Sequence, residues 1–143
     1  MTIEVKNINK SFDGRGKNLS VLEDINLTIN DGELVCLLGV SGGGKTTLFN
    51  VISGLLQPDQ GSVLLDGKDI TNQPGFISYM LQKDMLLPYK TIEDNVSLPL
   101  IIKGMKKEEA RKQVSSLFDE FGLAGTEKKY PHQLTGGMRQ RAA

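Results

Sequence analysis

Nine consecutive residues, GVSGGGKTT from Gly39 to Thr47, have the composition of a phosphate-binding turn. Gly39, Gly44, Lys45 and Thr46 match the pattern G-x-x-x-x-G-K-S/T. Glycines let the backbone curl until several N–H groups point at one anion, and they leave no side chain in its way. A lysine ammonium can reach the terminal phosphates, and a threonine hydroxyl is a ligand for Mg²⁺. A plain glycine turn is the alternative, and the Lys-Thr pair argues against it.

An apolar run and an amphipathic segment flank this turn. Leu34 to Leu38 are apolar at every position, which predicts a strand buried on both faces of a parallel sheet. From Lys45 onward the apolar residues recur with a helical period, at positions 48, 51, 52 and 55. The start of that helix would direct unpaired N–H groups and a positive dipole end at the same anion.

The remaining pattern predicts an α/β layer followed by a helical part. Residues 2–9 and 19–30 partly alternate apolar and polar, as half-buried strands do. Residues 62–67 predict a strand and turn, and residues 75–81 a further strand. A helix is expected from near Lys106, with Gly122 as its stop, because apolar residues at 110, 114, 117, 118 and 121 share one face.

Composition describes an ordinary globular domain. The 143 residues predict one domain, and 17 Lys plus Arg balance 17 Asp plus Glu. No strong net field therefore favours nucleic acid or anionic lipid as a partner. The single cysteine, Cys36, lies in the apolar run, so we expect a buried, reduced thiol. We find no signal peptide and no run of 18 apolar residues.

A second candidate anion site lies in PHQLTGGMRQRAA, from Pro131 to Ala143. Thr135, Gly136 and Gly137 precede helix-forming residues, so a hydroxyl cap, unpaired amides and a helix N-terminus would lie together at one place.

Phosphate groups do not identify the base of a nucleotide. Guanine-specific proteins of this kind usually carry N-K-x-D, which does not occur in the chain, so ATP is favoured.

Together, these motifs resemble the ATP-binding subunits of ATP-binding-cassette (ABC) transporters. Gly39–Thr47 is similar to the Walker A loop of that family, and Leu134–Gln140 to its signature motif. YMLQKDMLLPYKTIEDNV resembles the Q-loop region, with Gln82 at the glutamine position, and NKSF resembles the opening segment, with Phe12 at the adenine-stacking position. The resemblance covers essentially every residue of the chain.

The resemblance implies an α/β fold of the P-loop NTPase type, with N-terminal antiparallel strands, a parallel core and a helical subdomain. Residues 1–87 would form the ATP-binding core, and residues 88–143 the helical subdomain ending in the signature. ATP and Mg²⁺ are the implied cofactors. The implied ATP-binding residues are Phe12, Gly39, Ser41, Gly42, Gly43, Gly44, Lys45, Thr46, Thr47, Thr135, Gly136 and Gly137. Thr46 and Gln82 are the implied Mg²⁺ ligands, and Gln82 would also contact the attacking water.

The resemblance also implies partners. In the family, the glycine loop of one chain faces the signature of a second ATPase subunit in a head-to-tail dimer, with ATP between them. ATP would close the dimer and hydrolysis would release it, and this cycle drives permease subunits in the membrane. The chain would then be cytoplasmic, at the inner face of the membrane. GGMRQR is similar to the nitrate, sulfonate, taurine and pyrimidine-precursor importers, which favours a bacterial importer.

Three positions depart from the family pattern. Phe12 stands where tyrosine is common, and stacking needs only the ring face. Thr135 replaces the usual serine and keeps the hydroxyl. Met138 replaces the usual glutamine.

The carboxylates that complete the family's catalytic site are expected to be missing. The Walker B aspartate and the following glutamate come after the signature helix, where this sequence stops, so we expect an N-terminal part that does not hydrolyse ATP alone. Earlier carboxylates are weak substitutes, because Asp66-Gly67 is a turn pair and Asp119 and Glu120 should face solvent. His132 precedes the signature and does not match the family's switch histidine.

Two other interpretations stay open. An ABC protein acting as a mechanical clamp in repair or translation carries the same loop and signature. A complete small module that binds nucleotide without hydrolysing it would also fit. The apolar segment Leu98–Met105 could seat a helix of a membrane subunit, which would favour the transporter, or it could be core of the helical part.

Overall fold

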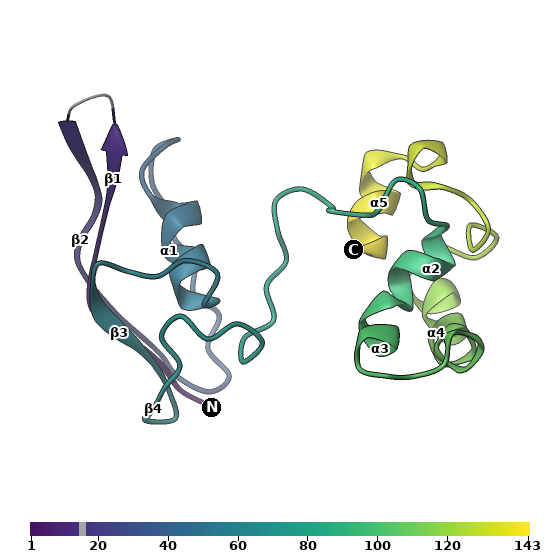
Figure 1. Cartoon of the computed structure of the whole chain (residues 1–143), viewed down its shortest axis with the longest axis horizontal. Helices are drawn as coiled ribbons and strands as arrows, with labels where there is room; N and C mark the ends of the chain where they lie inside the picture. Colours follow the sequence, from purple (N-terminus) through teal and green to yellow (C-terminus); the bar gives the residue numbers. More distant parts are fainter. Residues whose placement is uncertain (15–16) are drawn as a thin grey trace. The chain divides into compact units, whose positions relative to one another are not determined.

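The computed structural model describes residues 1–14 and 17–143 (Figure 1). The chain divides into two compact units, Met1–Tyr79 and Met80–Ala143. Residues 80–87, including Gln82, belong to the second unit. Each unit has its own hydrophobic core, and each is described below by itself.

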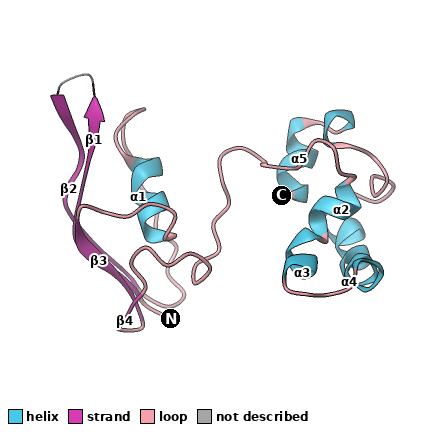
Figure 2. Ribbon diagram, viewed as in Figure 1, coloured by secondary structure: helices cyan, strands magenta, loops and turns pink. Residues whose placement is uncertain are grey.

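The described residues of the first unit form a four-stranded antiparallel sheet with one helix. Its strands are β1 (Ile3–Gly14), β2 (Lys17–Ile29), β3 (Gln60–Leu65) and β4 (Lys68–Asp69), in the order β2-β1-β3-β4. These strands confirm the predictions over 2–9, 19–30 and 62–67. Helix α1 (Lys45–Ile52) also forms and lies beside the sheet (Figure 2), but it ends before Leu55, which was expected on its apolar face and is exposed.

Packing of α1 against the sheet positions the glycine turn. The helix buries Leu48, Val51 and Ile52. These side chains belong to one cluster with buried residues of the sheet and the segment after β4: Val5, Ile8, Leu22, Val63 and Ile70. Burial of each apolar side chain of this size stabilises the fold by about 1.5–3 kcal/mol. The start of α1 is therefore fixed by the core beneath it.

The predicted strand over 34–38 is wrong. The segment has no strand structure, and Leu34 and Leu38 are 92% and 94% exposed. Cys36, expected to be buried, is exposed as well. A strand needs main-chain partners as well as apolar residues, and the strands of the described residues pair only among themselves, without this segment. The expected parallel pairing is accordingly not seen here.

The predicted strand over 75–81 is also wrong. Residues 75–79 are turn and irregular structure at the end of the first unit. Tyr79 stacks on Phe49 of α1, with ring centroids 6.1 Å apart. This contact between aromatic side chains, rather than a main-chain ladder, holds the end of the unit to α1.

The second unit is helical (Figure 2). It contains α2 (Ile92–Val96), α3 (Leu98–Ile102), α4 (Lys107–Glu120), a 3₁₀ turn (Pro131–Gln133) and α5 (Gly136–Ala142). Helix α4 matches the helix expected from near Lys106 to Gly122. Its buried face packs into a core that comprises Ile92, Val114, Phe118, Leu123, Leu134 and Ala142.

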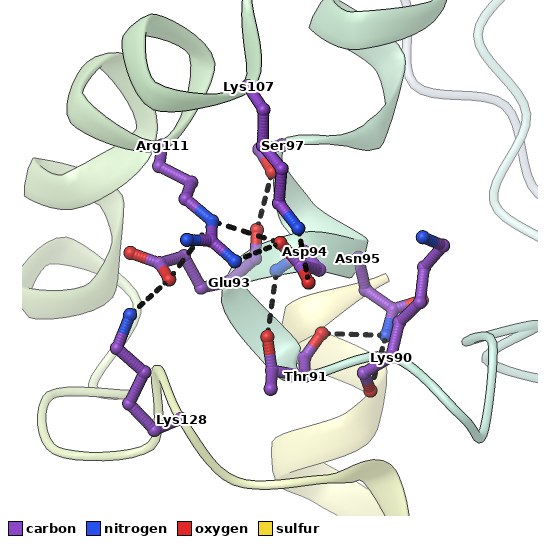
Figure 3. A network of polar contacts seen from close by, with 9 residues as sticks. All are labelled: Lys90, Thr91, Glu93, Asp94, Asn95, Ser97, Lys107, Arg111 and Lys128. Carbon is purple, nitrogen blue, oxygen red and sulfur yellow. Dashed lines mark hydrogen bonds and ion pairs between the residues drawn. The ribbon is translucent and has the colours of Figure 1, made fainter.

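A network of charges fastens α2 to α4 and to the segment before the 3₁₀ turn (Figure 3). The carboxylate of Asp94 accepts hydrogen bonds from Arg111 Nε (2.9 Å), Arg111 Nη2 (2.6 Å) and Lys107 Nζ (3.1 Å). Glu93 accepts from Lys128 Nζ at 2.7 Å. Burial raises the pKa of Asp94, but the bonds from Arg111 and Lys107 outweigh it and hold the pKa below its ordinary value.

The helices described in residues 1–14 and 17–143 include none with the length and hydrophobicity needed to cross a bilayer.

Candidate functional site

The glycine turn before α1 has a backbone that only glycine adopts easily. Gly44, the N-cap of α1, has φ 79°, and Gly42 has φ 80°. A Cβ atom at Gly44 would lie 2.8 Å from the carbonyl oxygen of Val21 in β2. The turn can therefore lie against the sheet only because position 44 carries no side chain.

The amides of this turn are largely free. Gly43 N donates to Val40 O at 3.1 Å, and the helical ladder begins with Leu48 N donating to Gly44 O at 2.9 Å. Among the described residues, the N–H groups of Gly44, Lys45, Thr46 and Thr47 have no acceptor, and Gly44 supplies no side-chain cap. Four adjacent donors and the positive end of α1 thus meet at one place, where an anion is favoured.

Lys45 folds back over the turn. Its Nζ donates to Gly39 O at 2.7 Å and to Val40 O at 2.8 Å. An ammonium group has three N–H donors, so the third remains for a phosphate oxygen. The half-buried stem and the two carbonyl contacts fix the position of the charge.

The hydroxyl groups of the turn differ in exposure. Ser41 and Thr46 are exposed and Thr47 is half-buried. Free amides, a fixed ammonium and exposed hydroxyls fit the phosphate groups of a nucleotide, and the Thr46 hydroxyl is a possible Mg²⁺ ligand. The described residues contain no group of three His, Cys, Asp or Glu that could hold a metal ion by themselves. The metal would therefore depend on phosphate oxygens as well as on this hydroxyl.

Phe12 lies near the tip of the β1–β2 hairpin, opposite Leu19, and its ring is partly exposed. Lys10 Nζ lies 5.6 Å from the ring centroid and forms an ion pair with Asp59 at 2.7 Å. Asp59 also accepts from Ser11 N at 2.7 Å. These hydrogen bonds, first from Lys10 and then from Ser11, lower the pKa of Asp59. Asp59 thus orders the strand that carries Phe12, a contact that the sequence analysis did not identify.

The other predicted residues lie in the second unit. Thr135 caps α5, because its Oγ1 accepts from Met138 N at 3.3 Å. Gly136 and Gly137 follow it and are exposed. Gln82 and Gly136 line one hollow of about 640 Å³, together with Lys83, Asp84, Met85, Arg139 and Gln140. The structure therefore places Gln82 beside the start of α5, while the glycine turn belongs to the first unit.

The carboxylates and the histidine considered as substitutes occupy ordinary positions. Asp66 forms a turn with φ 50° and accepts from Thr2 N at 2.7 Å. Asp119 and Glu120 are exposed at the end of α4. His132 stacks on Tyr130, with ring centroids 6.0 Å apart.

Comparison with known proteins identifies the family. A family model described as ABC transporter matches residues 22–143. The chain belongs to the ABC transporter family, as an ATP-binding domain. The glycine turn and the Thr135–Gly137 segment both lie within the matched ABC region, so the two candidate anion sites are parts of one domain type.

Two similar proteins are consistent with this family assignment. An ABC transporter ATP-binding protein of Bacillus subtilis is 41% identical over 141 residues, which cover 99% of this chain and 54% of the relative. The formylaminopyrimidine import ATP-binding protein of Halalkalibacterium halodurans is 49% identical over 123 residues, covering 86% of this chain and 47% of the relative. The chain thus spans about half the length of these relatives.

The fold is that of an ABC ATPase cassette. A dimeric structure of an ATP-binding cassette in a post-hydrolysis state, bound to ADP and Pi, superposes with a TM-score of 0.85. The sequences are 32% identical, and the match covers 98% of this chain and 66% of that one. The α/β fold of the P-loop NTPase type is therefore confirmed.

Proposed function

We propose that the chain is the ATP-binding part of a bacterial ABC importer, coupling ATP-driven closure of a dimer to transport. The glycine turn carries the proposal, because four adjacent free amides and the fixed ammonium of Lys45 fit the β- and γ-phosphates of ATP. The protein would act at the inner face of the cell membrane, bound to permease subunits. Nucleic acid is not among the proposed partners.

Each predicted site residue has a role in this proposal. Gly39–Thr47 holds the phosphates, and Thr46 and Gln82 contact Mg²⁺. Phe12 stacks on adenine with its exposed ring face. Thr135, Gly136 and Gly137 act on the ATP of a second ATPase subunit, in a head-to-tail dimer. The dimeric form of the matched cassette supports this arrangement.

A groove on the second unit is the proposed contact with the permease. Its volume is about 720 Å³, and its lining is mostly apolar, with Met80, Leu98, Ile102, Leu117 and Phe121 among its residues. Leu98 and Ile102 come from the segment that the sequence analysis singled out. Large exposed apolar surfaces mark sites of protein–protein contact, which favours a transporter over a mechanical clamp.

The sequence GGMRQR narrows the proposed kind of importer. The nitrate, sulfonate, taurine and pyrimidine-precursor importers are the proposed group. The Halalkalibacterium halodurans relative, named as a formylaminopyrimidine import ATP-binding protein, supports an importer of this kind.

We further infer that residues 1–143 bind ATP without hydrolysing it. Asp66, Asp119 and Glu120, the carboxylates considered as substitutes, are a turn residue and two exposed residues of a helix end. Of these, Asp66 lies in the same unit as the glycine turn, and its carboxylate accepts from Thr2 N. Steady-state phosphate release by this chain should equal that of its Lys45→Ala variant, and a release that depends on Lys45 would contradict the inference.

Calorimetric titration with Mg·ATP tests the binding site itself. Lys45→Ala should weaken the binding of ATP by about 10-fold to 100-fold, the range for loss of a hydrogen bond to a charged group. Lys112→Ala removes an exposed lysine of α4 and is the matched control, expected to bind as the unmodified chain does. Equal affinities of the chain and Lys45→Ala would refute the proposed phosphate site.

A further inference from the structure

The segment that carries Gln82 is held from two sides by the carboxylate of Asp84. Oδ1 accepts from Leu86 N at 3.2 Å, which closes a short turn inside the segment. Oδ2 accepts from Arg139 Nε of α5 at 3.0 Å. One side chain therefore both shapes the segment around Gln82 and ties it to the helix that follows Thr135.

The turn closed by Asp84 contains a strained residue. Met85 has φ 52°, in the left-handed region that residues with a side chain rarely adopt. Its side chain is exposed, so burial of methionine does not compensate for this conformation. Contacts on either side of Met85 compensate instead. Before it, Asp84 bonds with Arg139 and Leu86. After it, Leu87 N donates to Asn95 Oδ1 at 2.7 Å.

Helix α5 meets the segment at a second place. Gln140 Nε2 approaches Leu81 O at 3.5 Å, next to the ion pair between Asp84 and Arg139. Arg139 lies three residues after Gly136, one helical turn along α5. Gln82 and Gly136 line the same hollow as this ion pair. Leu81 and Asp84, on either side of Gln82, are therefore both joined to α5.

We propose that Asp84 and Arg139 are positioning residues that set Gln82 in register with the start of α5. The pair makes the placement of Gln82 depend on the placement of Gly136 and Gly137, so ATP that contacts either group shifts the other. Such coupling is reciprocal, because both groups bias one arrangement. This inference rests on the proposed function, in which Gln82 and the Thr135–Gly137 segment both act on bound ATP.

Amide hydrogen exchange, read by NMR on the whole chain, tests the proposal. Arg139→Gln should raise the exchange rates of the Leu86 and Met138 amides, which donate to Asp84 Oδ1 and Thr135 Oγ1, by about twofold to fivefold, the range for a partly exposed ion pair. Asp84→Asn keeps the Oδ1 acceptor for Leu86 N but loses the charge that pairs with Arg139. It should give the same increase, and the double variant should give no more than either single change.

Three controls separate positioning from general stability. Arg139→Lys keeps a cationic donor and should retain most of the protection of the Leu86 and Met138 amides, while Lys112→Gln, on α4, should leave both amides unchanged. Thermal melting of each variant identifies any loss of fold. If Arg139→Gln unfolds, the comparison of Asp84→Asn with the unmodified chain decides the question.

The outcomes distinguish this inference from the proposed function. Additive effects, or an Arg139→Gln variant in which exchange rises at Met138 of α5 but not at Leu86, would overturn the positioning role. Mg·ATP is then added to the unmodified chain and to Arg139→Gln. Absence of binding to the unmodified chain would refute the proposed function, whereas binding with identical spectral changes at Gly136 in both proteins would refute only the coupling.

Discussion

The two units place their candidate functional groups by different means. In Met1–Tyr79 the candidate phosphate-binding donors are main-chain amides, fixed by the backbone of Gly42 and Gly44 and by the packing of α1 on the sheet. In Met80–Ala143 the candidate groups are held by side chains, through the pair Asp84–Arg139 and the network around Asp94. The first arrangement depends on shape and the second on charge.

This contrast predicts how each unit responds to change. The placement of main-chain amides should tolerate changes of pH and salt but not of backbone conformation. A site held by carboxylates and guanidinium groups should do the reverse. Substitutions in each unit and a change of pH test this contrast.

Shortening a buried side chain in one core should destabilise only the unit that contains it. Ile8 and Ile92 are both fully buried, one in each cluster. Ile8→Ala and Ile92→Ala should each lower the free energy of unfolding by about 2–5 kcal/mol, since each leaves a cavity. Hydrogen exchange should accelerate in the unit that carries the change. Equal acceleration in both units after either substitution would show that the cores are not independent.

Two glycines of the turn provide a matched pair. Gly44→Ala combines a left-handed backbone with a clash against Val21 O, whereas Cβ at Gly42 would meet nothing within 4 Å. Gly44→Ala should cost about 1–3 kcal/mol of stability and abolish measurable binding of ATP. Gly42→Ala should cost less. Denaturant unfolding measures the stability of each variant, and calorimetry its binding of ATP. If Gly42→Ala were impaired as strongly as Gly44→Ala, the clash with Val21 O would not be the cause.

Acid should weaken the second unit through Asp94. The pKa of Asp94 is lowered below 3.8 in the folded chain. Its contribution to stability is therefore fully present above the unfolded pKa and is lost as pH falls through the folded pKa. Asp94→Asn should lower stability at pH 7 by about 1–2 kcal/mol and flatten the pH dependence below pH 4. Urea unfolding from pH 7 to pH 2, with exchange read at Ile92 and Glu93, checks both; an unchanged acid profile would contradict the assignment.

Local patterns in the sequence predicted the elements that depend on local chemistry. The alternation in 2–9 and 19–30 gave β1 and β2, the helical period after Lys45 gave α1, and Thr135 caps α5 as its residue type suggests. The family and the α/β fold followed from the two motifs. In these cases the determining residues lie within a few positions of one another.

Contacts between distant residues could not be predicted in the same way. The apolar composition of 34–38 suggests a buried strand, but burial depends on partners that composition does not specify. Asp84 and Arg139 are 55 positions apart, and Lys10 and Asp59 are 49 apart. Nothing in either local sequence marks these pairs, because charged residues on surfaces are common.

The contacts of Lys45 have a consequence for the speed and cost of recognition. Because Gly39 O and Val40 O already hold the ammonium, its stem loses little further rotational freedom when an anion arrives. The entropy of ordering this long side chain has been lost during folding rather than at encounter. The turn is therefore preorganised, and the proposed nucleotide would meet a rigid receptor instead of one that must assemble around it.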